Sequence, residues 1–196
     1  MAVQSPGVQQ RPELLDLPDQ FVGECVLLRP YRPGDGRAFF EAIDRHRQEL
    51  GTWVAWVEQY QTPEDGEAYV RRMQSKWIAR SALILGIWSA DGSRYFGGTG
   101  FQGFDWAVPS VELGYFLHAD ARGKGYAGEA IRLVTDFALQ SLAARRIWAS
   151  CDALNAPSVR LLERSGYRRE ATLRNECRDH HGSLRDTFIY AVTAGS

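Results

Sequence analysis

The sequence predicts an α+β fold with about seven strands and about four helices. Two observations carry this prediction. Apolar side chains repeat with the two-residue period of a strand in about seven segments, and with the 3.6-residue period of a helix in about four. The segments follow one another as β α α β β β α β α β β, and short turns between neighbouring strands favour mostly antiparallel pairing.

The first third of the chain supplies a tail, one strand and two helices. Residues 1–19 are polar and contain prolines, so we expect a loose tail or extended arm before a single domain at residues 20–196. Residues 21–31 alternate as a strand, and Asp35 is placed to cap the helix after it. Thr62 offers a capping hydroxyl ahead of a proline and two acidic residues, which predicts a second helix to about residue 80.

Two strands at residues 82–89 and 95–106 flank a hairpin turn at residues 90–93. The second strand contains glycine at positions 97, 98, 100 and 103. Because glycine weakens a strand, these positions predict a bulge or the close approach of another backbone.

The stretch from Val111 to Leu142 joins a strand to a helix through a basic, glycine-rich turn. Residues 111–118 alternate as a strand, and an apolar face with helical spacing begins at Ala127. Glycines between them remove Cβ atoms at the helix start, where unpaired backbone N–H groups carry partial positive charge. Arg122 and Lys124 add full charges at the same end, so we expect an anion there, with phosphate as the natural candidate.

Two other phosphate-binding motifs fit this turn less well. Gly123, Gly125 and Gly128 match the dinucleotide fingerprint G-x-G-x-x-G, and Asp152 stands about where a ribose-binding acid is expected. Residues 118–122, however, separate these glycines from their strand, and too little chain follows for the repeated strand–helix series of that fold. The triphosphate-loop motif lacks its first glycine and its serine or threonine.

The last quarter of the chain predicts a strand, a short helix and a final pair of strands. Residues 145–150 alternate as a strand, and Pro157 begins a helix that Ser165 and Gly166 end. Residues 167–173 and 184–192 form an antiparallel pair across the loop at residues 178–183.

Composition and charge argue against several classes of protein. The net charge of −1 is unlike that of a general nucleic-acid binder. The longest apolar run is far shorter than the ~20 residues that span a bilayer, and the N-terminus has no signal-peptide pattern. The three cysteines lack C-x-x-C spacing, which predicts a reducing, cytoplasmic setting and no metal site. We interpret His180 and His181 as loop surface.

The order of elements and several short strings resemble the GNAT acetyltransferase superfamily, and most of all its RimJ/RimL branch of ribosomal-protein N-terminal acetyltransferases. The turn Arg-Gly-Lys-Gly-Tyr-Ala-Gly at residues 122–128 is similar to the pyrophosphate loop of that superfamily. The resemblance runs from about residue 17 to residue 192. Its other strings are Leu28-Arg29-Pro30 with Asp35, the pair Trp53 and Trp56, Glu112 to Leu117, Asn155 with Ser158, Leu161 to Tyr167, Leu173-Arg174, and Gly182, Asp186 and Tyr190.

The resemblance implies a mixed, mostly antiparallel twisted sheet with helices on both faces, and a reaction in a ternary complex. An amine attacks the thioester of acetyl-coenzyme A directly, without an acetyl-enzyme and without a metal. The N–H of Leu117 is then the oxyanion donor, and Ser158 reaches the thioester sulfur as acid or hydrogen-bond donor. The implied coenzyme-binding residues are Phe116, Leu117, His118, Arg122, Gly123, Lys124, Gly125, Tyr126, Ala127, Asn155 and Ser158.

Several assignments remain open at this point. Many relatives have a glutamate and a tyrosine acid where this chain has Ser150 and Leu162, which leaves Ser158 as the remaining hydroxyl. Glu112 and Glu176 are both candidate bases. Trp53, Trp56 and Trp106 line the acceptor groove or belong to the core. Cys151 matches a cysteine of the RimL type or is a small residue at a buried strand end, and Asn155 also suits the cap of the short helix.

The sequence does not name the acceptor, which the resemblance limits to a protein N-terminal amine or a small-molecule amine. A larger donor such as succinyl-coenzyme A would use the same loop. A module that keeps the fold and senses coenzyme A without catalysis is the competing interpretation, and the missing tyrosine and glutamate support it. Relatives often form dimers, so a homodimer fits the resemblance, and we expect no nucleic acid and no membrane as partner.

Overall fold

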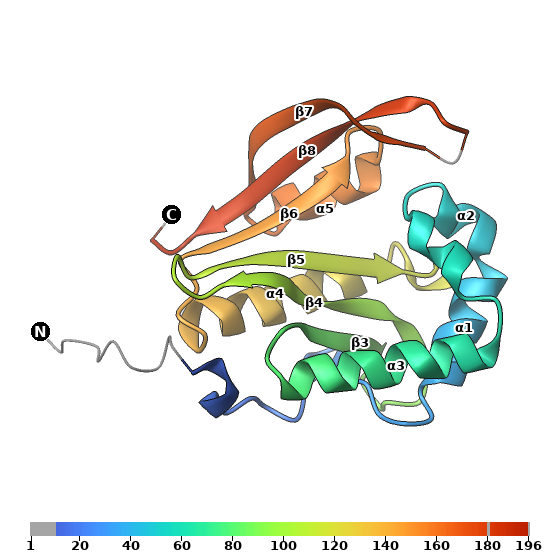
Figure 1. Ribbon diagram of the computed structural model, residues 1–196, viewed down its shortest axis with the longest axis horizontal. Coiled ribbons are helices and arrows are strands. Elements are labelled where there is room, and N and C mark those ends of the chain that lie inside the picture. Colours follow the sequence, from blue (N-terminus) through green and yellow to red (C-terminus); the bar gives the residue numbers. More distant parts are fainter. Residues whose placement is uncertain (1–10, 180, 196) are drawn as a thin grey trace, which may run out of the picture.

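An eight-stranded sheet forms the middle layer of the molecule in the computed structural model, which describes residues 11–179 and 181–195. The strand order is β1-β2-β3-β4-β5-β6-β8-β7 (Figure 1). Every neighbouring pair is antiparallel except β5 and β6, which are parallel. The strands are β1 (Phe21–Val22), β2 (Val26–Pro30), β3 (Leu83–Ser89), β4 (Tyr95–Asp105), β5 (Ser110–Leu117), β6 (Arg146–Asp152), β7 (Arg168–Arg178) and β8 (Leu184–Thr193).

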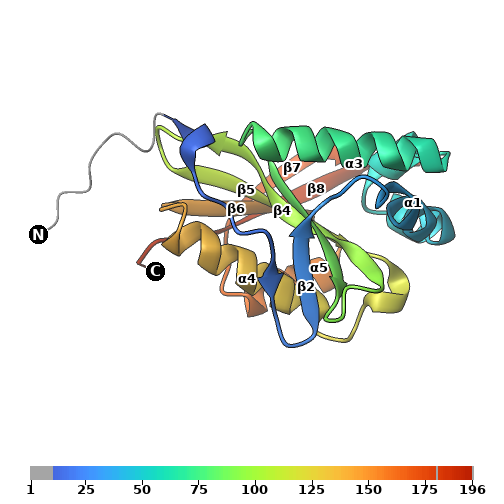
Figure 2. The same cartoon turned by 90° about the horizontal axis from the view of Figure 1, so that it is seen from below.

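Helices cover both faces of this sheet. Figure 2 shows α1 and α3 over one face and α4 and α5 over the other. The α-helices are α1 (Gly36–Arg45), α2 (Arg47–Gly51), α3 (Pro63–Ile78), α4 (Tyr126–Gln140) and α5 (Ala156–Arg164), with short 3₁₀ turns η2 (Pro12–Leu14), η3 (Ala55–Gln59) and η4 (Ala119–Ala121). None of the described helices combines the length and the hydrophobicity needed to cross a bilayer.

The predicted fold class is confirmed, with a few more elements than the sequence suggested. The expected first strand is divided into β1 and β2 by a turn, and the Glu129 carboxylate of α4 accepts hydrogen bonds from the backbone N–H groups of Glu24 and Cys25 in that turn. The aromatic segment after residue 46 contains α2 and η3. Residues 1–10 of the expected tail, and His180 of the expected surface loop, lie outside the described residues.

Local signals for helix ends have mixed outcomes. Thr62 caps α3 as predicted: its hydroxyl accepts from Asp65 N at 3.2 Å, and the Asp65 carboxylate accepts from Thr62 N at 2.9 Å. Asp35 precedes α1, but its side chain makes no capping bond. Its carboxylate instead accepts from the Arg29 guanidinium at 2.6 Å and from Arg32 N at 2.7 Å, because an ion pair with Arg29 competes for the same oxygens.

Two hydrophobic clusters hold the three layers together. The larger one lies between the sheet and α4, where Ile131 and Val134 are buried against strands β2 to β6. The other is aromatic and lies under α1 and α3, where the rings of Phe39 and Tyr69 stack with centroids 4.3 Å apart. Strands β4 and β5 contribute residues to both clusters, so they are packed on both faces.

The glycines of β4 permit the close approach that the sequence predicted. A Cβ on Gly97 would lie 2.1 Å from the carbonyl oxygen of Phe116, so only glycine fits against β5 at this position. The register also shifts between Gln102 and Asp105, as expected for a bulge.

Candidate active site

The parallel strands β5 and β6 pair over three residues only and then part. Ser110, Val111 and Glu112 face Arg146, Ile147 and Trp148, and no pair beyond these joins the two strands in the described sheet. The far edge of β6 is occupied by β8 throughout its length. Residues 113–117 of β5 therefore present one edge that no neighbouring strand uses, and we call this region the split (Figure 1).

Backbone direction shows which groups of β5 face the split. His118 N donates to Phe96 O of β4 at 3.1 Å, and the Phe116 carbonyl also points at β4. Backbone groups alternate in direction along a strand, so the N–H of Leu117 points the other way, into the split. The side chains of Phe116 and His118 lie on the α1 face of the sheet, where Phe116 packs edge-on against Phe39 and His118 stacks on His46.

The split leads to the glycine-rich turn before α4. Gly125 is the N-cap residue of α4 and adopts a left-handed φ of 84°, which glycine tolerates without strain. Within the described residues, the amide N–H groups of residues 123–127 donate no hydrogen bond to protein. Five free donors at the positive end of a 15-residue helix form a ready site for an anion.

The charged side chains of this turn are already engaged. The Arg122 guanidinium forms an ion pair with Glu49 of α2, and its Nε donates to the Leu117 carbonyl at 3.1 Å. Lys124 Nζ donates to the Asp120 carbonyl at 2.8 Å. Tyr126 stacks on Phe96 with ring centroids 4.5 Å apart. The predicted cofactor residues 122–127 thus lie together, although Arg122 turns its charge toward α2.

Asn155 and Ser158 lie at the start of α5, across the split from β5. The Asn155 side chain accepts from Ser158 N at 3.2 Å, which confirms its role as helix cap. The Ser158 hydroxyl meets the Tyr115 hydroxyl at 2.5 Å. Burial raises the pKa of Tyr115 above its ordinary 10, so this phenol stays protonated at neutral pH and is able to donate.

Cys151 of β6 completes this group. Burial raises the pKa of its thiol to about 11, while a hydrogen bond with Ser158 acts in the opposite direction. The thiol is therefore neutral at physiological pH and a poor nucleophile. Leu162, which occupies the family's usual tyrosine position, is completely buried, so that position belongs to the core here.

The residues expected to bind the acceptor lie away from Tyr115 and Ser158, either on the α1 face of the sheet or on other strands. Phe116 packs edge-on against Trp56 at 5.2 Å, and Trp53 lies 5.8 Å from the Arg185 guanidinium. Glu112 accepts from Gln102 Nε2 at 3.1 Å, whereas Glu176 accepts from Thr187 Oγ1 at 3.0 Å. These two predicted bases stand on different strands, β5 and β7.

None of the three tryptophans considered for the acceptor groove is fully buried, and Trp56 packs against the aromatic cluster. Trp106 differs from the other two because it stacks on Phe104 at 4.7 Å, just beyond the end of β4. Trp53 and Trp56 remain the pair that faces α1 and the β7–β8 arm.

Comparison with known proteins agrees with this geometry. The acetyltransferase (GNAT) domain family matches residues 26–168. The chain belongs to the GNAT acetyltransferase family. A curated relative, the protein named "Probable N-acetyltransferase YjcK" of Bacillus subtilis (strain 168), is 30% identical over 181 residues, covering 87% of this chain and 94% of its own.

Solved structures share the fold of this acetyltransferase. The microcin C7 self-immunity acetyltransferase MccE, solved with acetyl-CoA and AMP, has a TM-score of 0.83 at 21% identity and covers 90% of this chain and 97% of its own. The ribosomal L7/L12 alpha-N-protein acetyltransferase RimL, solved with coenzyme A, has a TM-score of 0.83 at 16% identity over 88% and 96% of the two chains. The expected likeness to ribosomal-protein acetyltransferases is confirmed, and this chain has the activity class of its family, acyl-coenzyme A-dependent N-acetyl transfer.

Sequence analysis missed two features of this acetyltransferase. The alternation of residues 111–118 places Tyr115 on the same strand face as Leu113 and Leu117, but it gives no sign that the Tyr115 hydroxyl has a partner. Glu49 gave no signal, because its partner Arg122 is distant in the sequence. The Tyr115–Ser158 hydrogen bond and the Arg122–Glu49 ion pair each join elements that are distant in the sequence and meet only in the fold.

Proposed function

We propose that this protein transfers the acetyl group of acetyl-coenzyme A directly to a primary amine within a ternary complex. The split between β5 and β6, which leads to the free amides at residues 123–127, is the observation that supports this proposal most. A pantetheine arm presents amide groups that suit an unpaired strand edge, and a diphosphate suits a helix N-terminus.

Coenzyme binding then depends more on backbone than on side chains. The N–H groups of residues 123–127 receive the diphosphate, with Lys124 as the nearest cation. Arg122 positions the loop through Glu49 and the Leu117 carbonyl. The pantetheine arm lies along the backbone of Phe116, Leu117 and His118. Asn155 offers its side-chain amide from the start of α5.

The chemical step needs a base, an oxyanion donor and an acid. Glu112 or Glu176 takes a proton from the amine, whose nitrogen attacks the thioester carbonyl carbon. The N–H of Leu117 stabilises the negative oxygen of the tetrahedral intermediate. As the C–S bond breaks, Ser158 donates its proton to the leaving thiolate and receives one from Tyr115, which is hydrogen-bonded to it. The base then releases the amine proton to solvent, and solvent returns a proton to Tyr115, so the enzyme gains and loses no net proton.

The acceptor class is a primary amine, either a protein N-terminus or a small molecule, that reaches the thioester from the side of Trp53 and Trp56. RimL is named for acetylating a ribosomal protein and MccE for self-immunity to microcin C7, so the shared fold does not choose between a protein and a small-molecule acceptor. The three free cysteines fit action in a reducing, cytoplasmic setting. Binding of nucleic acid or membrane is not part of the proposal, and a homodimer is compatible with it.

An acceptor screen tests the proposed function. Purified protein is incubated with acetyl-coenzyme A and a panel of peptides and amines, while released thiol and the added acyl mass are measured together. We expect thiol release that depends on an amine, with one acetyl group on the product. Tight coenzyme binding without thiol release across the panel would instead favour a sensing module, and faster release from succinyl-coenzyme A would correct the donor.

A further inference from the structure

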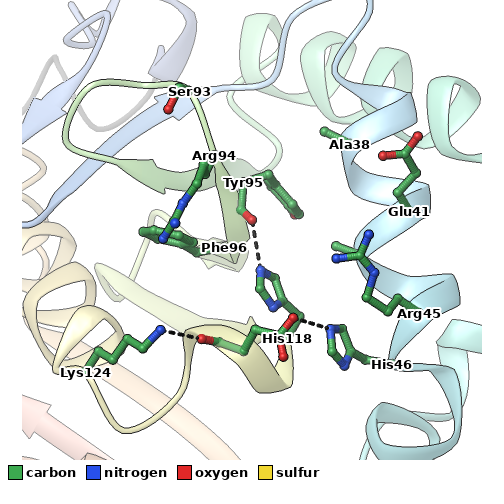
Figure 3. Close-up of a pocket in the computed structure, with 12 residues that line it drawn as sticks. Ala38, Glu41, Arg45, His46, Ser93, Arg94, Tyr95, Phe96, His118 and Lys124 are labelled. Atoms are coloured by element: carbon green, nitrogen blue, oxygen red, sulfur yellow. Dashed lines mark hydrogen bonds and ion pairs between the residues drawn. The ribbon is translucent and has the colours of Figure 1, made fainter.

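A pocket of about 440 Å³ lies beside Lys124 of the coenzyme loop and against α1 (Figure 3). It is lined by α1, by the β3–β4 turn and by the segment that leads from β5 to Lys124. None of its lining residues belongs to β6 or α5, the elements that carry Cys151, Asn155 and Ser158. The pocket is therefore separate from the side chains proposed to act on the thioester, although it shares His118 and Lys124 with the strand and loop proposed to hold the coenzyme.

Three metal-ligating side chains meet in this pocket. His46, His118 and Asp120 each offer one ligand atom, and these atoms lie within 4.8 Å of one another. His46 Nε2 and Asp120 Oδ2 are 3.4 Å apart, and the imidazole rings of His46 and His118 are nearly parallel with centroids 5.2 Å apart. In Figure 3 both histidines project into the pocket from different elements.

The hydrogen bond of His118 fixes which of its nitrogens carries the proton. Its Nε2 lies 2.9 Å from the backbone carbonyl of Tyr95, and a carbonyl oxygen only accepts, so Nε2 is the donor. Nδ1 then carries the lone pair of the neutral ring. That atom is buried and has no hydrogen-bond partner among the described residues.

A carbonyl behind the ring is the arrangement that metal-binding histidines use. The outer hydrogen bond sets the tautomer and the ring orientation, and leaves the inner nitrogen free to bind an ion. A buried acceptor without a partner costs free energy, which a bound cation would recover. His118 is thus oriented for ligation rather than only for packing.

We propose that His46, His118 and Asp120 form a site for a divalent transition-metal ion of the Zn²⁺ type. Two imidazoles and one carboxylate suit zinc, cobalt or nickel better than magnesium or calcium, which prefer all-oxygen sites. Three protein ligands leave a fourth position open to the pocket, as in zinc sites that bind a further small ligand.

The spacing of the three ligands fits such an ion after a small adjustment. Zinc ligands at about 2.0–2.2 Å in a tetrahedron lie roughly 3.3–3.5 Å from one another. The His46–Asp120 contact already has this length. The ligand atoms lie within 4.8 Å of one another, so binding an ion requires an approach of up to about 1.5 Å, and the 65% exposed Asp120 side chain is free to rotate toward either histidine.

The charges around the site are mixed. Asp120 contributes a negative charge as ligand, whereas Arg45, Arg94 and Lys124 line the same pocket. Both arginines are exposed, so water and salt screen their repulsion of the ion. Their positive charge favours an anion, such as hydroxide or chloride, at the open fourth position.

The ion would connect two parts of the chain that meet at the coenzyme loop. His46 immediately precedes α2, and Asp120 stands two residues before Arg122. The sequence predicts no metal site because it lacks closely spaced ligands such as C-x-x-C, whereas these three residues come from distant segments.

A cobalt titration of the untagged full-length chain tests the site. The protein is first treated with a chelator, and Co²⁺ binding is followed by visible absorption, since tetrahedral Co²⁺ absorbs far more strongly than octahedral Co²⁺. We expect one ion per chain, displaced by one equivalent of Zn²⁺ and not by Mg²⁺. Absence of visible bands in the wild-type protein would overturn the proposal.

Variants assign the ion to its ligands. His46→Ala and Asp120→Asn should each weaken Co²⁺ binding by at least about 100-fold, since even the loss of an outer hydrogen-bond partner costs roughly 10- to 100-fold. The matched control is His181→Ala, which removes a histidine of the β7–β8 loop and should leave binding unchanged. Circular dichroism and melting of the metal-free variants show that each one is folded.

Three outcomes would reject the assignment. Binding that survives both His46→Ala and Asp120→Asn would place the ion elsewhere. Binding lost in His181→Ala would place it at the adjacent histidines of the loop. A strong near-ultraviolet band would indicate thiolate ligation by one of the exposed cysteines instead. None of these results bears on the acetyl-transfer reaction, which is tested separately.

Discussion

The two sides of the coenzyme loop differ in what they leave unpaired. On the side of the split, backbone N–H groups are free and few charged side chains take part. On the side of α2, the side chains are paired: Arg122 with Glu49, and His46 with Asp120. The difference suggests that the loop reads the coenzyme through its backbone and is held in place by side chains of the neighbouring helix.

Gly125→Glu should have the largest effect on coenzyme binding. A side chain at φ 84° is strained by roughly 1–2 kcal/mol, and the new carboxylate would repel the diphosphate at the helix N-terminus. We expect coenzyme A affinity in calorimetry to fall by more than about 100-fold, which corresponds to about 2.7 kcal/mol.

Gly182→Glu is the matched control, because Gly182 has φ 82° and equally open surroundings but lies between β7 and β8. It introduces the same strain and the same charge away from the split. If both variants lose affinity equally, general strain rather than the loop explains the loss, and the backbone side of the comparison fails.

The glycine-rich loop, whose free backbone N–H groups face the split, was also the part of the site that the sequence predicted well. Glycines, basic residues and helical periodicity follow one another directly in residues 111–142, so local rules of chain conformation place the loop at the start of α4. The capping box of Thr62 and the Asn155 cap are likewise local. Each depends on residues within a few positions of one another.

The side-chain pairings were not predictable in the same way. The Tyr115–Ser158 hydrogen bond and the Arg122–Glu49 ion pair depend on which strands are neighbours. The order β6-β8-β7 and the turn held by Glu129 depend on the same information. Periodicity gives the face on which a side chain lies, but not the element that packs against it.

Tyr115→Phe should have an intermediate effect, which falls on the chemical step. The variant removes one hydroxyl from a buried face and keeps the ring, so coenzyme affinity should stay within about twofold. We expect kcat to fall by about 100-fold, and Ser158→Ala to cause a similar fall, because general acid catalysis contributes at least about 10²-fold. Steady-state kinetics with separate calorimetry distinguishes kcat from binding.

The two variants share one route for the proton, so the double variant should be no slower than the slower single variant. The pKa of Tyr115 is raised above 10, and a required acid loses activity only above its own pKa. Loss of the Tyr115 proton should therefore cause no fall in wild-type kcat between pH 7 and pH 10. A fall in this range that disappears in Tyr115→Phe, or equal losses in affinity and kcat, would contradict the assignment.

Glu49→Gln should have the smallest effect and tests the side-chain half of the comparison. The Arg122 and Glu49 side chains are 35% and 49% exposed, and pairs so exposed contribute about 1 kcal/mol or less. If the pair only positions the loop, coenzyme affinity should fall by no more than about fivefold. Arg122→Gln should give at least this loss, because it also removes the hydrogen bond from Nε to the Leu117 carbonyl, and the double variant should match Arg122→Gln. A rise in affinity in Glu49→Gln that Arg122→Gln abolishes would show instead that the freed guanidinium binds the diphosphate itself, and that the loop uses side chains on both of its sides.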